Sequence, residues 1–120
     1  PHTVVVLPPT LALGDLDLSV APHVAPHPSA GTNVEFVQIL GSGHIAMRVH
    51  ERGVGETRSC GTGAAAAAIA TSFWAGQHLA TPTWTVDVPG GRLRVRLLPD
   101  QHVELAGPAA LVADGTVTLP

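Results

Sequence analysis

A run of small apolar residues at positions 64–70 places the strongest constraint on how this chain can fold. The run reads Ala-Ala-Ala-Ala-Ala-Ile-Ala, and no charged residue follows it before Gln77. Alanine is the best helix former, so the run predicts a helix over residues 62–74, with Gly76 just after its end. A helix without a polar side must be surrounded by protein. We therefore expect an α+β fold in which a strongly curved, mostly antiparallel β-sheet or barrel wraps around one buried central helix.

Alternating and β-branched runs on both sides of this helix predict the strands of the sheet. The expected strands cover residues 3–7, 33–40, 44–50, 84–88, 92–98, 102–106 and 116–119. In the fifth of these, Arg92, Arg94 and Arg96 alternate with apolar residues, which is typical of a strand with one face in water. No internal repeat is visible.

The connections between these strands are predicted from proline, glycine and small polar residues. Residues 10–32 indicate one long connection, with a weakly helical or turn-like piece near residues 16–20. A three-residue hairpin loop is expected at positions 41–43, which read Gly-Ser-Gly. Residues 53–63 are expected to form a glycine-bearing loop that leads into the helix.

Length, charge and cysteine content narrow the functional class. The 120 residues suffice for one domain, and the net charge of −3, with six arginines and no lysine, argues against a nucleic-acid partner. The single cysteine cannot form an internal disulfide, so a reducing, cytoplasmic location is expected. No apolar run approaches the roughly 20 residues that span a bilayer, so no membrane partner is expected.

Cys60 stands directly before the predicted helix, in the segment Arg-Ser-Cys-Gly-Thr-Gly. The first amides of a helix lack internal partners and carry partial positive charge, which favours an anion such as a thiolate or a carboxylate. A lone cysteine is more often a small buried hydrophobe. Here Gly61 and Gly63 leave the backbone amides around Thr62 uncovered, so we favour a functional thiol beside a carboxylate site.

Other ligands fit the sequence less well. A phosphate-binding loop needs a lysine after its glycines, and this chain has none; a dinucleotide-binding loop needs a third glycine where Ala66 stands. The chain has seven histidines, but one cysteine is a poor zinc set, so no metal is expected and most histidines are interpreted as surface or loop residues. Glu51 and Arg52 are read about equally well as an exposed pair or as a clamp for charged substrate groups.

Taken together, three segments resemble the diaminopimelate epimerase family. Residues 51–68 read ERGVGETRSCGTGAAAAA and resemble the second active-site motif of that family; residues 31–40, GTNVEFVQIL, and the opening Pro1-His2 match further segments in the expected order. The resemblance implies half of a pseudo-symmetric two-domain fold and a cofactor-independent isomerase. Such enzymes interconvert L,L- and meso-2,6-diaminopimelate in lysine and peptidoglycan precursor biosynthesis.

The resemblance also implies a role for each matching residue. Cys60 corresponds to one of two cysteines that act as thiolate base and thiol acid on opposite faces of the α-carbon. Gly61 and Thr62 would bind the α-carboxylate through their amides. Asn33, Glu51 and Arg52 would hold the distal groups of the substrate, and His2 and Glu51 would tune the pKa of the thiol.

The chain also departs from the family pattern. The other cysteine is absent, so residues 1–120 are interpreted as the C-terminal half, without the N-terminal half or the opening strands of this domain. We expect this half alone to be inactive and the full-length enzyme to be a homodimer. Two alternatives stay open: a proline racemase-like enzyme of the same fold, and a non-enzymatic carboxylate-binding or redox-sensing module.

Overall fold

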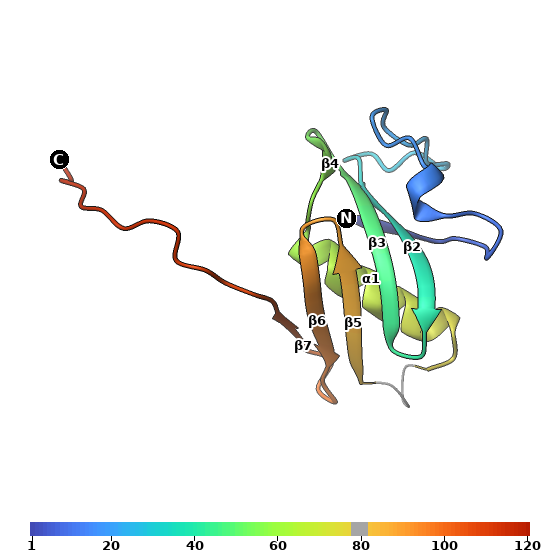
Figure 1. The fold of residues 1–120 in the computed structure, drawn as a ribbon. Helices are drawn as coiled ribbons and strands as arrows, with labels where there is room; N and C mark the ends of the chain where they lie inside the picture. The colour runs from blue at the N-terminus through green and yellow to red at the C-terminus, as the bar shows by residue number, and fades with distance from the viewer. Residues whose placement is uncertain (78–81) are drawn as a thin grey trace.

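The computed structural model describes residues 1–77 and 82–120, which form one curved sheet and one long helix (Figure 1). The elements in chain order are β1 (His2–Val6), the 3₁₀ helix η1 (Leu13–Asp15), β2 (Asn33–Gly41), β3 (His44–Glu51), β4 (Gly55–Thr57), α1 (Gly61–Trp74), β5 (Thr83–Val88), β6 (Gly91–Leu97) and β7 (Val103–Ala106). The α+β class expected from the sequence is confirmed.

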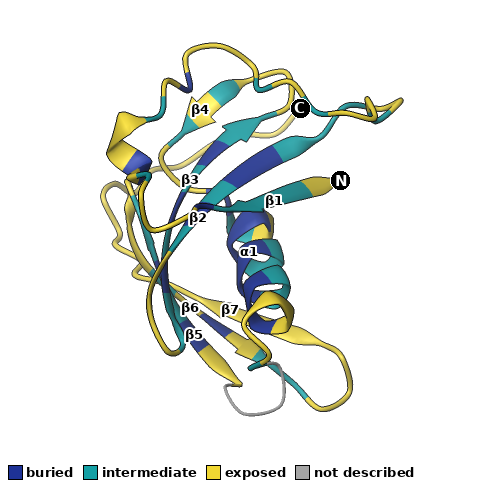
Figure 2. Ribbon diagram, turned by 90° about the vertical axis from the view of Figure 1, so that its right-hand side faces the viewer, coloured by how far each residue is buried: buried dark blue, intermediate teal, exposed yellow. Residues whose placement is uncertain are grey.

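The sheet is mixed but mostly antiparallel, with the order β1-β2-β3-β5-β6-β7 and β4 paired to β3. Two pairs are parallel, β1 with β2 and β3 with β5. The sheet curls around α1 (Figure 2) but does not close, because β1 and β7 are its two edges. Of the two forms expected, an open curved sheet is therefore present and a barrel is not.

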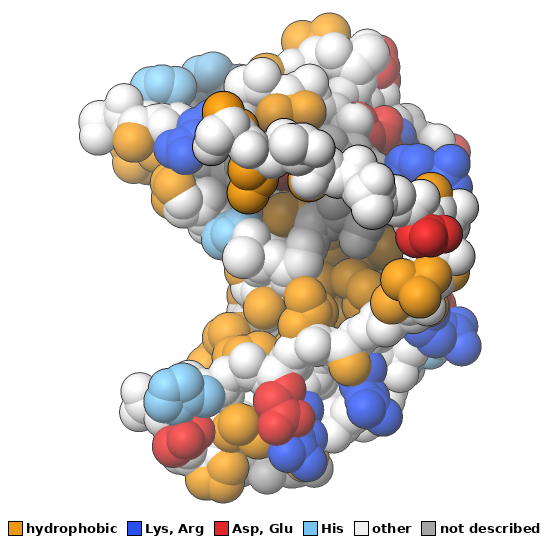
Figure 3. Space-filling view, turned by 90° about the vertical axis from the view of Figure 1, so that its left-hand side faces the viewer, with side chains coloured by type: hydrophobic (Ala, Val, Ile, Leu, Met, Phe, Trp, Pro, Cys, Tyr) orange, Lys and Arg blue, Asp and Glu red, His pale blue; other side chains and the backbone are white. Residues whose placement is uncertain are grey.

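The core lies between the concave face of the sheet and one side of α1. Its buried members include Val37, Ile45, Met47, Val49, Ala64, Ala67, Ala68, Trp84, Val86 and Val95. The expectation that protein surrounds the helix on every side is wrong for the described residues. Phe73 and Trp74 at its end are 63% and 75% exposed, because the sheet covers only one side. Figure 3 shows a hollowed face of the molecule with hydrophobic side chains gathered in the hollow.

The end of α1 is set by Gly76, as predicted. This glycine has a φ of +65°, and its N–H donates to the carbonyl of Phe73 at 3.0 Å. The N–H of Gln77 donates to the carbonyl of Ser72 at 2.7 Å. The two bonds form a Schellman motif, which satisfies carbonyls that the last helical turn leaves free.

Two local predictions in the first half of the sheet need correction. Gly41 pairs with His44, so the hairpin turns through Ser42 and Gly43 rather than through three residues, and a register shift between Ile39 and Gly41 absorbs the difference. The expected loop 53–63 contains the short strand β4, which pairs antiparallel with the end of β3. Three residues carry too little periodicity to be recognised without their partner strand.

The long connection from β1 to β2 also differs in detail. Its helical turn lies at Leu13–Asp15 rather than at residues 16–20. The Asp15 and Leu16 N–H groups close the turn on the carbonyls of Ala12 and Leu13. Farther along, the Asp17 side chain accepts the Ser19 N–H at 2.9 Å and makes a bend. Short polar side chains compete with helical bonds in this way.

The strand expected at residues 116–119 is absent. Residues 107–120 have no regular structure, are exposed, and extend away from the sheet (Figure 1). The β-branched pattern of the segment is real, but a strand exists only where a neighbour accepts its backbone hydrogen bonds. No such neighbour lies beside this segment among the described residues.

Candidate functional site

Cys60 is the N-cap residue of α1. Its backbone is extended, with φ −135° and ψ 109°, and its Sγ accepts a hydrogen bond from the Gly63 N–H at 3.4 Å. The Thr62 hydroxyl lies 3.7 Å from the same sulfur. Sulfur thus takes the place that a serine or aspartate oxygen usually fills at a helix start. With 8% of its surface exposed, Cys60 is buried and is itself a member of the hydrophobic core.

The first turn of α1 offers backbone donors next to this sulfur. The first bond of the helix runs from the Ala64 N–H to the Cys60 carbonyl at 2.8 Å, so the N–H groups of Gly61 and Thr62 have no partner inside the helix. The turn holds no acidic residue. A Cβ on Gly61 would lie 2.8 Å from Leu105 Cδ2, so β7 closes one side of this helix end. The remaining donors are suited to an anion.

A second part of the chain fixes the segment that leads to Cys60. At the tip of the β5–β6 hairpin, the Gly90 N–H donates to the Arg58 carbonyl at 2.7 Å. The Arg58 guanidinium donates to the Pro89 carbonyl at 3.3 Å. The sequence marks residues 89–91 as a turn but gives no sign that this turn supports the thiol, because the contact spans about thirty positions.

The strand residues predicted for the site share the helix-facing side of the sheet. Val37 on β2 and Val49 on β3 pack in the core against α1. Side chains alternate along a strand, so Asn33 on β2 and Glu51 on β3 lie on the same side as these valines. On β1, Val4 packs against the core, which places His2 on the helix-facing side as well. The structure therefore brings His2, Asn33, Glu51 and Cys60 to one end of the concave face.

Glu35 belongs to this group and was missed in the sequence. It lies on β2 two residues after Asn33, is completely buried, and has its Oε1 2.6 Å from His2 Nδ1. Burial raises the pKa of Glu35, and the hydrogen bond to His2 opposes that rise. One signal for it exists in the sequence. Within Asn-Val-Glu-Phe-Val, the glutamate lies two residues before Val37, so both side chains are expected on the same inward face of the strand.

Asn33, Glu51 and Arg52 are held by short contacts at the ends of β2 and β3. The Asn33 side-chain oxygen accepts the Arg52 backbone N–H at 2.9 Å. Glu51 accepts a hydrogen bond from the Thr57 hydroxyl of β4 at 2.5 Å. The strand that the sequence did not predict therefore positions one of the predicted site residues.

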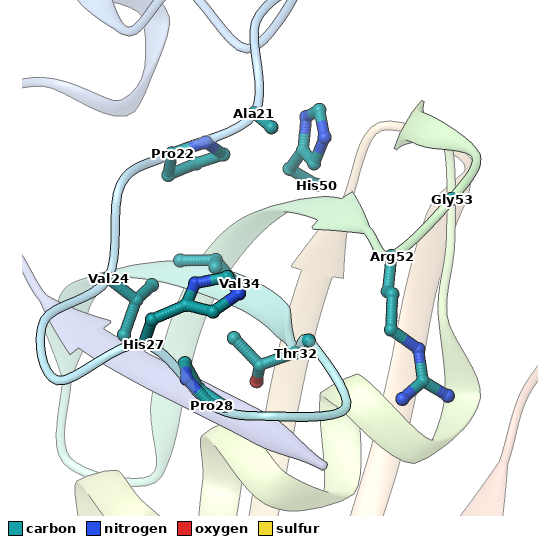
Figure 4. Close-up of a pocket in the computed structure, with 11 residues that line it drawn as sticks. Ala21, Pro22, Val24, His27, Pro28, Thr32, Val34, His50, Arg52 and Gly53 are labelled. Carbon is teal, nitrogen blue, oxygen red and sulfur yellow. The ribbon is translucent and has the colours of Figure 1, made fainter.

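The side chain of Arg52 is directed to the long loop. Its guanidinium donates to the Ala30 carbonyl at 2.6 Å. It also borders a cavity of about 180 Å³ between this loop and the sheet, lined by Ala21, Pro22, Val24, His27, Pro28, Gly31, Thr32, Val34, His50, Arg52 and Gly53. Figure 4 shows His27 and Val34 among the residues that line this cavity, with the Arg52 side chain extending from the end of β3. Cys60 does not line this cavity.

Two arginines of β6 pair with acids of the neighbouring strands. The expected wet face of β6 is confirmed, since Arg92 pairs with Asp87 and Arg96 pairs with Glu104 on the exposed side. His44 contacts Asp87, and His78 lies outside the described residues. Within the described part of the chain, no three His, Cys, Asp or Glu side chains are grouped to hold a metal, and no helix is long and apolar enough to cross a membrane.

The curved sheet around a single helix, with a thiol capping that helix, is the arrangement expected for a half-domain of an epimerase. Residues 1–112 match the diaminopimelate epimerase family. The chain belongs to this family. It spans 36% to 41% of the length of the three relatives described next.

Three relatives named diaminopimelate epimerase illustrate the similarity. The protein of Streptomyces coelicolor is 55% identical over 106 residues, which cover 82% of this chain and 36% of the relative. That of Mycobacterium ulcerans is 47% identical over 111 residues, 92% of this chain and 37% of the relative. That of Synechococcus sp. is 46% identical over 120 residues, 97% of this chain and 41% of the relative.

Proposed function

We propose that this chain supplies one face of the active site of a cofactor-independent isomerase that interconverts L,L- and meso-2,6-diaminopimelate. The observation that carries the proposal is the Cys60 sulfur at the start of α1, 3.4 Å from the Gly63 amide and beside the free amides of Gly61 and Thr62. Membership of the diaminopimelate epimerase family supports the substrate class.

The chemistry proposed for Cys60 is proton exchange with the α-carbon. As a thiolate it takes the α-proton from one face, breaking the C–H bond and forming S–H, while a second cysteine delivers a proton to the opposite face. In the other direction Cys60 is the thiol that gives up its proton. Negative charge develops on the α-carbon and its carboxylate during this exchange. The Gly61 and Thr62 amides would stabilise that charge as preorganised donors.

The distal end of the substrate carries a second ammonium and a second carboxylate. We assign Asn33, Glu51 and Arg52 to this end, since their side chains offer an amide, a negative charge and a positive charge. In the present structure the Arg52 guanidinium donates to the Ala30 carbonyl at 2.6 Å. Binding a distal carboxylate would therefore exchange this carbonyl for a charged partner, which forms a stronger bond with arginine.

The second cysteine belongs to the part of the enzyme that this chain does not contain. We place residues 1–120 as the C-terminal half, and propose that the complete protein is a cytoplasmic homodimer and that the half alone is inactive. The similarity to proteins named diaminopimelate epimerase favours this proposal over a proline racemase. The free amides beside Cys60 favour it over a thiol sensor, which has no need of them.

Deuterium incorporation tests the proposal. The complete protein in D₂O should place solvent deuterium at the α-carbon of diaminopimelate, whereas the isolated chain should not. Cys60→Ser should abolish exchange and keep substrate affinity within a few fold. Exchange by the isolated chain, or full activity of Cys60→Ser, would contradict the two-cysteine mechanism. Exchange with proline and none with diaminopimelate would favour the racemase alternative.

A further inference from the structure

Glu35 is a fully buried acid within reach of the helix end, and the proposed chemistry assigns it no role. A Cβ on Gly63 would lie 2.8 Å from Glu35 Oε1 and 3.1 Å from Cys60 Sγ. The carboxyl oxygen and the sulfur are thus at most 5.9 Å apart, the sum of those two distances. The acid lies next to the reacting atom without contacting the solvent.

Glu35 contacts His2 through only one of its two carboxylate oxygens, and the contact is short. Oε1 lies 2.6 Å from His2 Nδ1, while Oε2 is buried with no partner among the described residues. The His2 side chain is 24% exposed, against 0% for Glu35. His2 is therefore a surface-facing ring that a buried carboxylate holds by one nitrogen.

The register of the sheet explains why this contact forms. Glu35 pairs with Val4 across the parallel β1–β2 ladder, and His2 lies two residues before Val4 on the same side. A glutamate at this position reaches diagonally to the first residue of the neighbouring strand. Glu51 from β3 and Cys60 from α1 are further titratable groups that face this end of the sheet.

We propose that Glu35 is a positioning residue of the proposed epimerase site, which holds His2 in the Nδ1–H form and turns Nε2 outward as the proton-accepting nitrogen of the ring. The two nitrogens of an imidazole point in divergent directions, so a bond at Nδ1 directs Nε2 away from the carboxylate. A carboxylate bonded to one ring nitrogen fixes which nitrogen carries the proton. Burial raises the pKa of Glu35, and the hydrogen bond to His2 opposes that rise and favours the anionic form.

A ¹⁵N spectrum of the histidine rings tests the tautomer without reference to activity. The complete protein, labelled at histidine and held at about pH 8, above the ordinary imidazole pKa of about 6.5, should show His2 protonated at Nδ1. His2→Gln identifies the resonance. His44 is an internal control, because its Nε2 lies 2.7 Å from Asp87 Oδ2 and should carry the proton instead. A His2 ring protonated at Nε2, or a proton shared onto Glu35, would overturn the proposal.

Two substitutions then test the consequence for turnover, which rests on the proposed function. Glu35→Gln keeps an acceptor for the Nδ1–H of His2 and should retain the tautomer, with kcat within about threefold. Glu35→Met should lose both the acceptor and the tautomer, and it should lower kcat by roughly 10- to 100-fold with little change in KM. Glu104→Gln, on exposed β7, is the matched control for charge. Equal losses in Glu35→Gln and Glu35→Met would refute an orienting role. If neither wild type nor control is active while the tautomer is as expected, the proposed function fails and the assignment for Glu35 stands.

Discussion

The Gly90 N–H at the tip of the β5–β6 hairpin donates a hydrogen bond to the Arg58 carbonyl 2.7 Å away, two residues before Cys60. The hairpin and the helix start are thereby joined at the point where the sulfur is presented. A Cβ on Gly90 would lie 3.0 Å from the Arg58 oxygen and 3.4 Å from Ser59 Cβ. Any side chain at Gly90 must therefore displace the backbone that leads to the thiol.

The first prediction concerns this junction. Gly90→Ala should lower kcat of the complete protein by about tenfold, because a small displacement of a reacting group is costly, with a loss of stability of about 1 kcal/mol or less. Gly41→Ala is the control, since a Cβ there would meet no atom within 4 Å. Steady-state kinetics and urea unfolding measure the two effects. Identical kinetics for the two variants would show that the hairpin does not support Cys60.

The second prediction concerns Gly63, where the absence of a side chain makes room for two others. Alanine favours a helix over glycine by about 1 kcal/mol. Gly63→Ala should nevertheless destabilise the protein by about 1 to 2 kcal/mol, because its Cβ would press on the buried carboxylate of Glu35 and on the Cys60 sulfur.

Gly61→Ala serves as the comparison for Gly63→Ala in the same helical turn. Its Cβ would meet only the end of the flexible Leu105 side chain, which can move. We expect Gly61→Ala to cost less in urea unfolding than Gly63→Ala. A stabilising Gly63→Ala would show that the packing around Glu35 is looser than described.

The third prediction concerns the anchor of the long loop. Arg48 of β3 bonds Glu56 through two nitrogens, at 2.7 and 3.0 Å, and donates from a third to the Leu13 and Leu16 carbonyls at 2.6 and 2.9 Å. Lysine cannot reproduce this fork. Arg48→Lys should therefore raise amide hydrogen exchange in residues 13–20 by roughly tenfold, a loss of about 1.4 kcal/mol locally. Arg94→Lys, on the exposed side of β6, should leave exchange in that loop unchanged.

The fourth prediction concerns acid stability. The bond from Arg92, followed by the bond from His44, lowers the pKa of Asp87 from 3.8 to about 2. A carboxyl whose pKa is lowered in the folded state stabilises the protein at pH values above its unfolded-state pKa. This contribution is lost as the pH falls from about 4 to about 2. Because the Asp87 side chain is 29% exposed, solvent screening reduces the contribution to about 1 kcal/mol.

Urea unfolding of Asp87→Asn at several pH values measures that contribution. The variant should be less stable than the parent by about 1 kcal/mol at pH 7, and most of this deficit should be lost near pH 2. Asp114→Asn, in the exposed tail, should follow the parent at every pH. A deficit for Asp87→Asn that stays constant between pH 7 and pH 2 would exclude the ionic explanation.

Much of the architecture follows from local patterns. The alanine run and Gly76 predict α1 to within one residue at its start, and the period-two runs predict six of the strands within one or two residues. Cys60, Asn33, Glu51 and His2 were chosen from sequence, and the structure brings them to one end of the concave face. Local periodicity and capping suffice for the helix and the strands because these depend on neighbours in the chain, whereas His2 and Asn33 are chosen from the resemblance to the diaminopimelate epimerase family.

The features that the sequence did not predict depend on distant partners. Residues 116–119 have the pattern of a strand without a neighbour to pair with, and β4 is a strand only because the end of β3 lies beside it. The contact of Glu35 with His2 depends on the parallel pairing of β1 with β2, and the contact of Gly90 with Arg58 also joins distant parts of the chain. The residue order of the chain thus determined a helix capped by a thiol. The curvature of the sheet determined which side chains surround that thiol. Those surroundings depend on hydrogen bonds and burial between remote segments, and no local sequence pattern encodes such contacts.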